Sequence, residues 1–151
     1  MKISVLWMGR TKEKFIKEAI KKYIKDIGTM ANIETTEIKE AKGVFSEKRK
    51  PSSALFEEGG RIVKQAGDFV LLDETGEMMS SVEFAEFFRD KNSCRFVIGG
   101  PYGVSAQVKE AASRKLSLSR MTLPHELARV VLLEQIYRGL SIVKGRGYHH
   151  A

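Results

Sequence analysis

Hydrophobic and polar positions along the chain alternate between short apolar runs and longer segments with helical spacing. The apolar runs predict strands over residues 2–8, 33–38, 69–72, 96–98 and 116–118. The segments that follow these runs carry apolar residues three and four positions apart, which is typical of helices. Strands that alternate with helices predict an α/β fold, with a mostly parallel sheet and helices on both of its faces.

Capping residues and glycines indicate where the helices begin and end. Thr11 is expected to cap the first helix and Gly28 to end it. The last helix is expected to run to about Val143, with Pro124 in its first turn. The expected N-caps of the other helices and of the last one are Ser52 or Ser53, Ser80 or Ser81, Ser105 and Thr122.

The segments without periodicity are predicted loops. Residues 40–53 are polar and rich in lysine and arginine, and they predict a mobile basic loop. Residues 73–76, Asp-Glu-Thr-Gly, predict a loop at the end of the third strand. Neither an internal repeat nor a linker-like stretch divides the chain, so we expect one domain over residues 1–151.

The last helix is apolar on all sides, because residues 130–133 read Val-Val-Leu-Leu. Such a helix must be covered on more than one side. Either the helix is central within one subunit, or a second subunit covers part of it. We favour a homodimer, because a chain of 151 residues can hardly surround a helix and closed twofold dimers are the commonest assembly.

Composition and charge narrow the class of protein. Hydrophobic residues make up 42% and charged residues 30%, which is ordinary for a soluble globular protein. No apolar run approaches the roughly 18 residues that span a membrane, and the N-terminal run is too short for a signal peptide, so we expect a cytoplasmic protein with no membrane partner. A net charge of +7 favours a polyanionic partner, although an ordinary basic surface has the same composition.

Cysteine and histidine offer little chemistry by themselves. Cys94 is the single cysteine, which excludes an intrachain disulfide, and its place in a predicted strand favours a structural thiol. His125, His149 and His150 have no cysteine or carboxylate at ligand spacing, so we predict no metal site. His125, near the start of a helix, is expected to be neutral and structural.

Two loops follow predicted strands and resemble ligand-binding segments. Residues 99–103, Gly-Gly-Pro-Tyr-Gly, lack both the spacing of a dinucleotide fingerprint and the lysine of a P-loop. Residues 117–124 carry hydroxyl and apolar side chains with Arg120 as the single charge, which suits a neutral heterocycle such as adenine better than a triphosphate. Since both loops leave the carboxyl ends of strands, the sequence predicts a ligand site at that edge of the sheet.

The carboxyl terminus reads Tyr148-His149-His150-Ala151. Untethered ends usually fray, so a polar aromatic end of this kind suggests a segment that is held in place and used.

Several of these segments together resemble the RlmH family, SPOUT-superfamily methyltransferases that act on pseudouridine in large-subunit ribosomal RNA. The resemblance also extends to ISVLWMGR near the N-terminus and to residues 71–76, so it spans the chain. The segments that carry it most specifically are residues 96–105 (FVIGGPYGVS), 116–129 (LSLSRMTLPHELAR), 134–138 (EQIYR) and 148–150 (YHH).

The resemblance implies a C-terminal trefoil knot, a homodimer, a pocket for S-adenosylmethionine (SAM) without a metal, and a C-terminal tail that contributes to the active site. The positions of this chain that match the pocket of the family are Leu72, Gly100, Ser119, Arg120, Met121, Thr122, Leu123 and Pro124.

The functional hypothesis is transfer of the SAM methyl group to N3 of a pseudouridine in 23S ribosomal RNA, on the large subunit or the assembled ribosome. His149 or His150 would take the proton from N3, Tyr148 would stack on the base, and Arg138 or Arg146 would hold a phosphate. The alternative is a non-catalytic RNA-binding module with the same basic surface, and the two intact loops argue against it.

Overall fold

The computed structural model describes residues 1–42 and 52–150, and a five-stranded sheet lies at its centre. The strand order is β2-β1-β4-β3-β5, and all the paired strands run parallel, which confirms the predicted α/β fold. The strands are β1 (Lys2–Met8), β2 (Asn32–Ile38), β3 (Val70–Glu77), β4 (Ser93–Ile98) and β5 (Arg114–Leu116). The basic loop expected over residues 40–53 lies for the most part outside the described residues.

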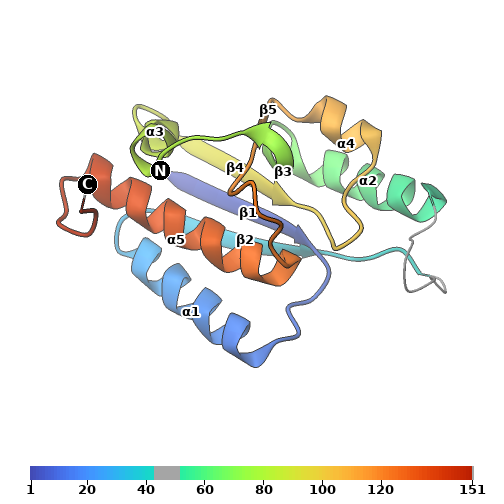
Figure 1. The fold of residues 1–151 in the computed structure, drawn as a ribbon, viewed down its shortest axis with the longest axis horizontal. Coiled ribbons are helices and arrows are strands. Elements are labelled where there is room, and N and C mark those ends of the chain that lie inside the picture. The colour runs from blue at the N-terminus through green and yellow to red at the C-terminus, as the bar shows by residue number, and fades with distance from the viewer. Residues whose placement is uncertain (43–51, 151) are drawn as a thin grey trace.

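Helices cover both faces of the sheet (Figure 1). On one face, α1, α3 and α5 pack on Ile3, Val5 and Phe96, whereas α2 and α4 pack on Leu6 and Val97 from the other face. These two sets alternate along β1 and β4, as side chains on a strand must. The helices are α1 (Lys14–Gly28), α2 (Ser52–Ala66), α3 (Ser81–Ala85), which continues as the 3-10 turn η1 (Glu86–Phe88), α4 (Ala106–Ala111) and α5 (His125–Val143).

Strand β3 is longer than its apolar run predicts. The prediction of a loop over residues 73–76 is wrong, because β3 continues to Glu77. The strand is irregular there, since both Leu72 and Glu77 pair with Leu116 of β5. A Cβ atom at Gly76 would lie 2.7 Å from the backbone nitrogen of Leu116, so only glycine allows this close approach.

Strand β5 also begins earlier than predicted. Arg114 pairs with Val70 of β3, and the strand ends at Leu116 rather than at residue 118. The apolar pattern misplaces β5 because it is an edge strand whose first two side chains, Arg114 and Lys115, are exposed.

The expected helix caps are right in part. Ser80 caps α3 in a capping box with Glu83, and α1 ends at Gly28. Thr11 and Thr122 are not caps: α1 begins at Lys14, and Pro124 occupies the N-cap position of α5 instead of its first turn. Ser105 occupies the N-cap position of α4, but its side chain makes no capping hydrogen bond.

Helix α5 is covered largely by its own chain. Leu132 and Leu133 are fully buried within the single subunit, and Val130 and Val131 are half-buried. The packing partners of α5 include α1, α3 and β4, so much of the apolar excess that suggested a dimer is buried inside the subunit. Although α5 is apolar, no helix in the described part of the chain has the length and hydropathy needed to cross a membrane.

Candidate functional site

The carboxyl ends of β4 and β5 lie at one edge of the sheet, level with Leu72, where the regular pairing of β3 is interrupted. Leu72 of β3 pairs with Ile98 of β4 on one side and with Leu116 of β5 on the other. The glycine loop, residues 99–103, leaves β4 at this level, and the hydroxyl loop, residues 117–124, leaves β5 there. The structure therefore brings the predicted cofactor residues Leu72 and Gly100 and the hydroxyl loop to the same edge.

The glycine loop is a tight turn in which two glycines are needed for the turn itself. The N–H of Gly103 donates to the carbonyl of Gly100 at 3.0 Å, and Gly103 has a φ of 78°, which favours glycine. A Cβ atom at Gly99 would lie 2.7 Å from Cγ1 of Val104. At Gly100 a Cβ atom would meet Met8 at an ordinary 3.5 Å, so the turn does not require glycine there.

The hydroxyl loop is braced at its base and open at its tip. The N–H of Ser117 donates to the carbonyl of Glu77, and its hydroxyl donates to the carbonyl of Ser119 at 2.9 Å. The hydroxyl of Ser119 in turn accepts from the N–H of Met121 at 2.9 Å. Within the described residues no hydrogen bond engages the backbone N–H of Thr122, and the Met121 side chain is 79% exposed. The tip thus offers an uncommitted donor beside an exposed apolar side chain.

Asp73 adds a carboxylate to this edge that the sequence prediction missed. It follows Leu72 directly and accepts the N–H and the hydroxyl of Thr75, both at 2.8 Å. Burial alone would raise the pKa of Asp73, but the two bonds from Thr75 and the charges of Lys109 and Lys115 outweigh it and lower the pKa. The only available signal was an acidic residue directly after a buried strand.

Glu126, in the first turn of α5, holds the start of α1 from a distance in sequence. Its Oε1 atom accepts the backbone N–H groups of Lys12 and Glu13, at 2.8 and 3.1 Å. These amide groups belong to Glu13, the N-cap residue of α1, and to the residue before it, so Glu126 fixes the chain where it enters the helix. This bond across the fold leaves Thr11 free for another partner.

That partner is Arg129, a fully buried arginine one turn further along α5. Its two terminal nitrogens donate to the hydroxyl of Thr11 and the carbonyl of Met8, each at 2.8 Å. Its guanidinium lies 5.1 Å from the centre of the Trp7 ring. Burial, and then the charge of Arg129, lowers the pKa of His125, so this histidine is neutral near pH 7, as predicted.

The C-terminal tail, residues 145–150, folds back against the end of α5. Gly145 has a φ of 66°, and the N–H of Arg146 donates to the carbonyl of Ser141 at 2.8 Å. The Arg146 side chain reaches Thr29, at the end of α1, at 3.2 Å. The tail is therefore held, as its composition suggested.

Four residues of the tail and α5 form one connected cluster. Glu134 accepts two bonds from Arg138, at 3.0 and 2.5 Å, and one from the hydroxyl of Tyr148, at 3.2 Å. The Arg138 guanidinium lies 4.8 Å from the Tyr148 ring centre, and Nη1 contacts Nδ1 of His149 at 3.2 Å. Burial, and then the charge of Glu134, raises the pKa of Tyr148, which stays a protonated donor. The sequence prediction missed Glu134 as the acceptor common to both side chains.

One chain does not bring the tail to the hydroxyl loop. The hydroxyl loop leads into the first turn of α5, which begins at His125. Arg138 lies 13 residues further along this helix, and His149 contacts Arg138 there. At the rise of an α-helix this separation is about 20 Å. Figure 1 shows the carboxyl terminus at one end of α5 and the entry into α5 at the other. The predicted catalytic and cofactor residues therefore form two clusters within a subunit.

Comparison with known proteins assigns the family. The family described as "Predicted SPOUT methyltransferase" matches residues 1–149. A ribosomal RNA large subunit methyltransferase H from Thermodesulfovibrio yellowstonii is 45% identical over 150 residues, which cover 99% of each chain. A protein of the same name from Maridesulfovibrio salexigens is 43% identical over 157 aligned positions, covering 99% of this chain and 98% of the relative. The chain belongs to the SPOUT methyltransferase family, and within it to the RlmH proteins. The resemblance drawn from the two loops and the tail is confirmed.

Solved structures support the same fold for this SPOUT protein. A methyltransferase from Legionella pneumophila, in complex with SAM, matches with a TM-score of 0.52 at 13% identity, over 90% of this chain and 65% of the other. A tRNA methyltransferase from Aquifex aeolicus matches with a TM-score of 0.56 at 18% identity, over 91% of this chain and 69% of the other. The trefoil knot implied by the resemblance stays a prediction.

Proposed function

We propose that this RlmH protein transfers the methyl group of SAM to N3 of a pseudouridine in 23S ribosomal RNA, on the large subunit or the assembled ribosome. The names of the relatives support ribosomal RNA as the substrate. The choice of pseudouridine as the target nucleotide rests on the family resemblance. The observation that carries the proposal is the meeting of Leu72, the glycine loop and the hydroxyl loop at one edge of a sheet. We infer one domain that acts in the cytoplasm, where ribosomes are.

The residues at this edge fit the cofactor. The hydroxyl loop offers the uncommitted N–H of Thr122 and the apolar side chains of Met121 and Leu123, which suit adenine. Leu72 and Gly100 would line the same pocket, together with Ser119, Arg120 and Pro124. When bound, SAM supplies an electrophilic methyl group on a positively charged sulfur. Asp73, which its partners keep ionised, is placed to accept from polar groups of the ligand.

The tail would position the target base and handle its proton. Tyr148 offers an aromatic face for stacking, and Arg138 or Arg146 offers a cation for phosphate. A guanidinium can only donate, so the Arg138 contact makes Nδ1 of His149 an acceptor. That lone pair is thereby occupied, whereas His150 is exposed, so His150 is the base that needs no rearrangement.

Two subunits would build one complete site. The tail lies about 20 Å along α5 from the hydroxyl loop of its own chain, too far for a proton transfer within one subunit. We therefore infer a homodimer in which the tail of one subunit serves the loops of the other. The apolar α5 side chains left accessible include Leu127, which is 37% exposed, and the half-buried Val131, one turn apart on the helix. We expect the dimer contacts at these side chains and not at Leu133, which is fully buried within its own subunit.

Mass spectrometry of 23S ribosomal RNA from a strain that lacks the protein tests the reaction. We expect one pseudouridine to lose a methyl group, and the purified protein with SAM to restore it. Calorimetry with S-adenosylhomocysteine separates the alternative: an RNA-binding module without catalysis would bind no cofactor. Unchanged ribosomal RNA in the deletion strain would overturn the proposal.

A further inference from the structure

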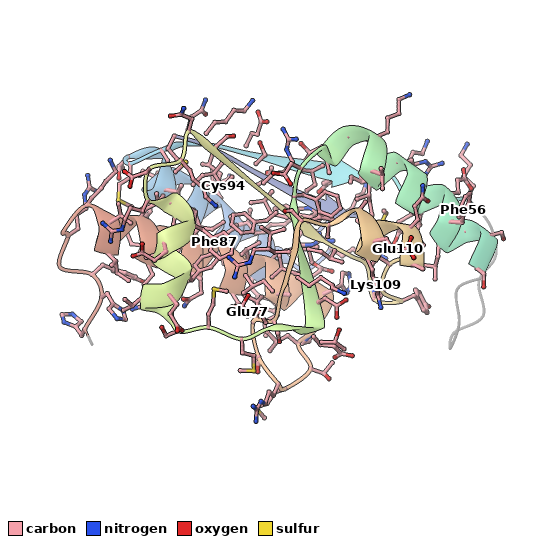
Figure 2. The ribbon with its side chains drawn as sticks, turned by 90° about the horizontal axis from the view of Figure 1, so that it is seen from above. Phe56, Glu77, Phe87, Cys94, Lys109 and Glu110 are labelled. Atoms are coloured by element: carbon pink, nitrogen blue, oxygen red, sulfur yellow. The ribbon has the colours of Figure 1, made fainter. Side chains whose placement is uncertain are left out.

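A pocket lies at the amino ends of the strands, on the edge opposite the two loops. Its volume is about 230 Å³, and its lining includes Lys2 of β1, Arg95 of β4 and Arg114 of β5. In Figure 2, Phe87 and Cys94, which also line it, lie in the left half of the molecule, away from α4 on the right. We call it the amino-edge pocket; no residue of the glycine or hydroxyl loop lines it.

The pocket exists because neighbouring strands start at different levels. Strand β4 begins at Ser93, opposite Lys2 of β1, but β3 joins β4 only where Val70 pairs with Phe96. On that side, no strand among the described residues pairs with Ser93–Arg95. A strand edge without a partner presents backbone groups that can accept a ligand in place of a strand.

Positive charge dominates the lining. Four cations, Lys2, Lys91, Arg95 and Arg114, face a single carboxylate, Asp68, within the pocket. Lys2 and Arg114 also have partners just outside it, since they pair with Glu34 and Glu77 at 3.2 and 2.5 Å. The charge of the other two is not offset in this way.

Lys91 and Arg95 carry charges that no carboxylate in the described part of the chain neutralises at ion-pair distance. The Lys91 ammonium lies 5.2 Å from the centre of the Phe87 ring, and Arg95 donates to the carbonyl of Ala66. That bond engages Nη1 of the guanidinium, and its Nη2 and Nε atoms make no hydrogen bond within the described residues. Two cations held over an open strand edge are suited to a phosphate group.

The pocket and the tail lie at the same end of the molecule. In Figure 1 the amino terminus, next to Lys2, and the carboxyl terminus both lie at that end. The turn η1 separates the two features: Phe87 lines the pocket, and Phe88 packs so closely on Gly139 of α5 that a Cβ atom there would lie 2.7 Å away. Gly139 adjoins Arg138, which contacts the tail.

We propose that the amino-edge pocket binds a backbone phosphate of the RNA substrate, through Lys91 and Arg95, beside the tail that positions the target base. The inference rests on the proposed function for the identity of the RNA. Its chemistry, a phosphate group on two cations that form no ion pair among the described residues, also fits a free phosphorylated ligand. The experiment separates these two sources.

The test compares Lys91→Gln, Arg95→Gln and the double variant with Lys17→Gln, which removes one charge from the exposed face of α1. Methyl transfer is measured on ribosomal substrate, and binding of S-adenosylhomocysteine by calorimetry. We expect the double variant to raise KM about tenfold and to reduce the salt dependence of RNA binding by about one released counterion per lost contact. Cofactor binding and kcat should stay at the wild-type level. Because Arg95 also bonds Ala66, Lys91→Gln covers the case in which Arg95→Gln fails to fold.

The outcomes are distinct. An equal rise in KM for Lys17→Gln would mean that net charge alone matters, and would overturn the pocket. An unchanged KM in both single variants would overturn the RNA assignment. In that event, binding of inorganic phosphate that Lys91→Gln abolishes would assign the pocket to a free phosphorylated ligand, and absence of such binding would remove the site altogether. If the wild-type protein does not bind S-adenosylhomocysteine, the proposed function is contradicted, whatever the result for the amino-edge pocket.

Discussion

The two ends of α5 differ in how firmly the attached segments are held. The hydroxyl loop, which enters the helix, is braced at Ser117 and Ser119 but leaves the N–H of Thr122 without a partner among the described residues. The tail, which leaves the helix, is fixed by Glu134, Arg138 and Thr29. An open segment can receive a ligand, whereas a fixed one can present side chains in a set geometry at little further entropic cost. In the proposed function, the hydroxyl loop therefore binds the cofactor, and the tail presents its side chains to the RNA.

Removal of Tyr148 to Ala151 should have the largest effect. The deletion takes away the stacking face and both candidate bases, so we expect methyl transfer to fall by about 100-fold or more, since one positioned base alone is worth roughly 10²–10⁴ in rate. Binding of S-adenosylhomocysteine should persist, because the hydroxyl loop lies at the other end of α5. His149→Ala, His150→Ala and Tyr148→Ala separate the contributions, and His150→Ala should cost more than His149→Ala. A truncated protein that methylates ribosomes at the native rate would show that the tail presents nothing.

Leu127→Arg should separate the subunits, and thereby the tail of one subunit from the loops of the other. A charge placed in an apolar contact costs about 2 kcal/mol, or roughly 30-fold in the dimer dissociation constant, and activity should fall with the dimer population. Sedimentation measures the association. Leu133→Arg is the contrasting variant: Leu133 is fully buried within the subunit, so this change should unfold the chain. A native chain that sediments as a monomer while remaining active would rule out the shared site.

Gly100→Val tests the proposed cofactor site without changing the tail. The first side-chain carbon would contact Met8 at an ordinary distance, so the fold should persist, while the branched methyl groups reduce the space beside the loop. We expect affinity for S-adenosylhomocysteine to fall about tenfold, as for other moderate losses of fit. Circular dichroism checks the fold, and calorimetry the affinity. Wild-type affinity in a folded variant would place Gly100 outside the pocket.

The smallest effect concerns pH. Burial lowers the pKa of His125 below 6.5, so the unfolded chain takes up this proton first as the pH falls. Its neutral form therefore favours the folded state fully above the unfolded pKa, and stability is lost below it. Replacing His125 by Gln should flatten the fall in Tm between about pH 7.5 and about pH 5.5, as thermal melts will show. A Tm that falls equally in both proteins would indicate that other groups cause the change.

The sequence predicted the bounds of a helix or strand best where residues within that element determine them. Apolar runs located β1 fully, and Ser80 with Glu83 marked the start of α3, because both signals act over a few residues. The start of α1 could not be predicted locally, since Glu126, more than 100 positions away, accepts the amides of Lys12 and Glu13 directly before the helix. Edge strand β5 was misplaced for a similar reason: pairing with β3, not hydrophobicity, decides where it begins.

The same distinction applies to the site. The two loops and the tail were recognisable from residue types, and the structure places the loops at the expected edge. Glu134 and Asp73 were missed because a carboxylate acquires its role from the donors that the fold brings to it. The length of α5 was predicted, but the contacts that hold the tail at the far end of this helix, and so separate it from the hydroxyl loop, were not.

The packing of α5 on β1 constrains how the protein is made. Ile3 and Val5 of the first strand share one core with Leu133 and Leu140, which are synthesised last. A nascent chain can therefore cover this face of β1 with α1 and α3 first, but the core on this face is complete only when α5 has been added. Contacts so distant in sequence slow folding and leave apolar surface exposed in the meantime. Until α5 has been synthesised, part of this apolar face therefore stays exposed, which favours aggregation of the incomplete chain.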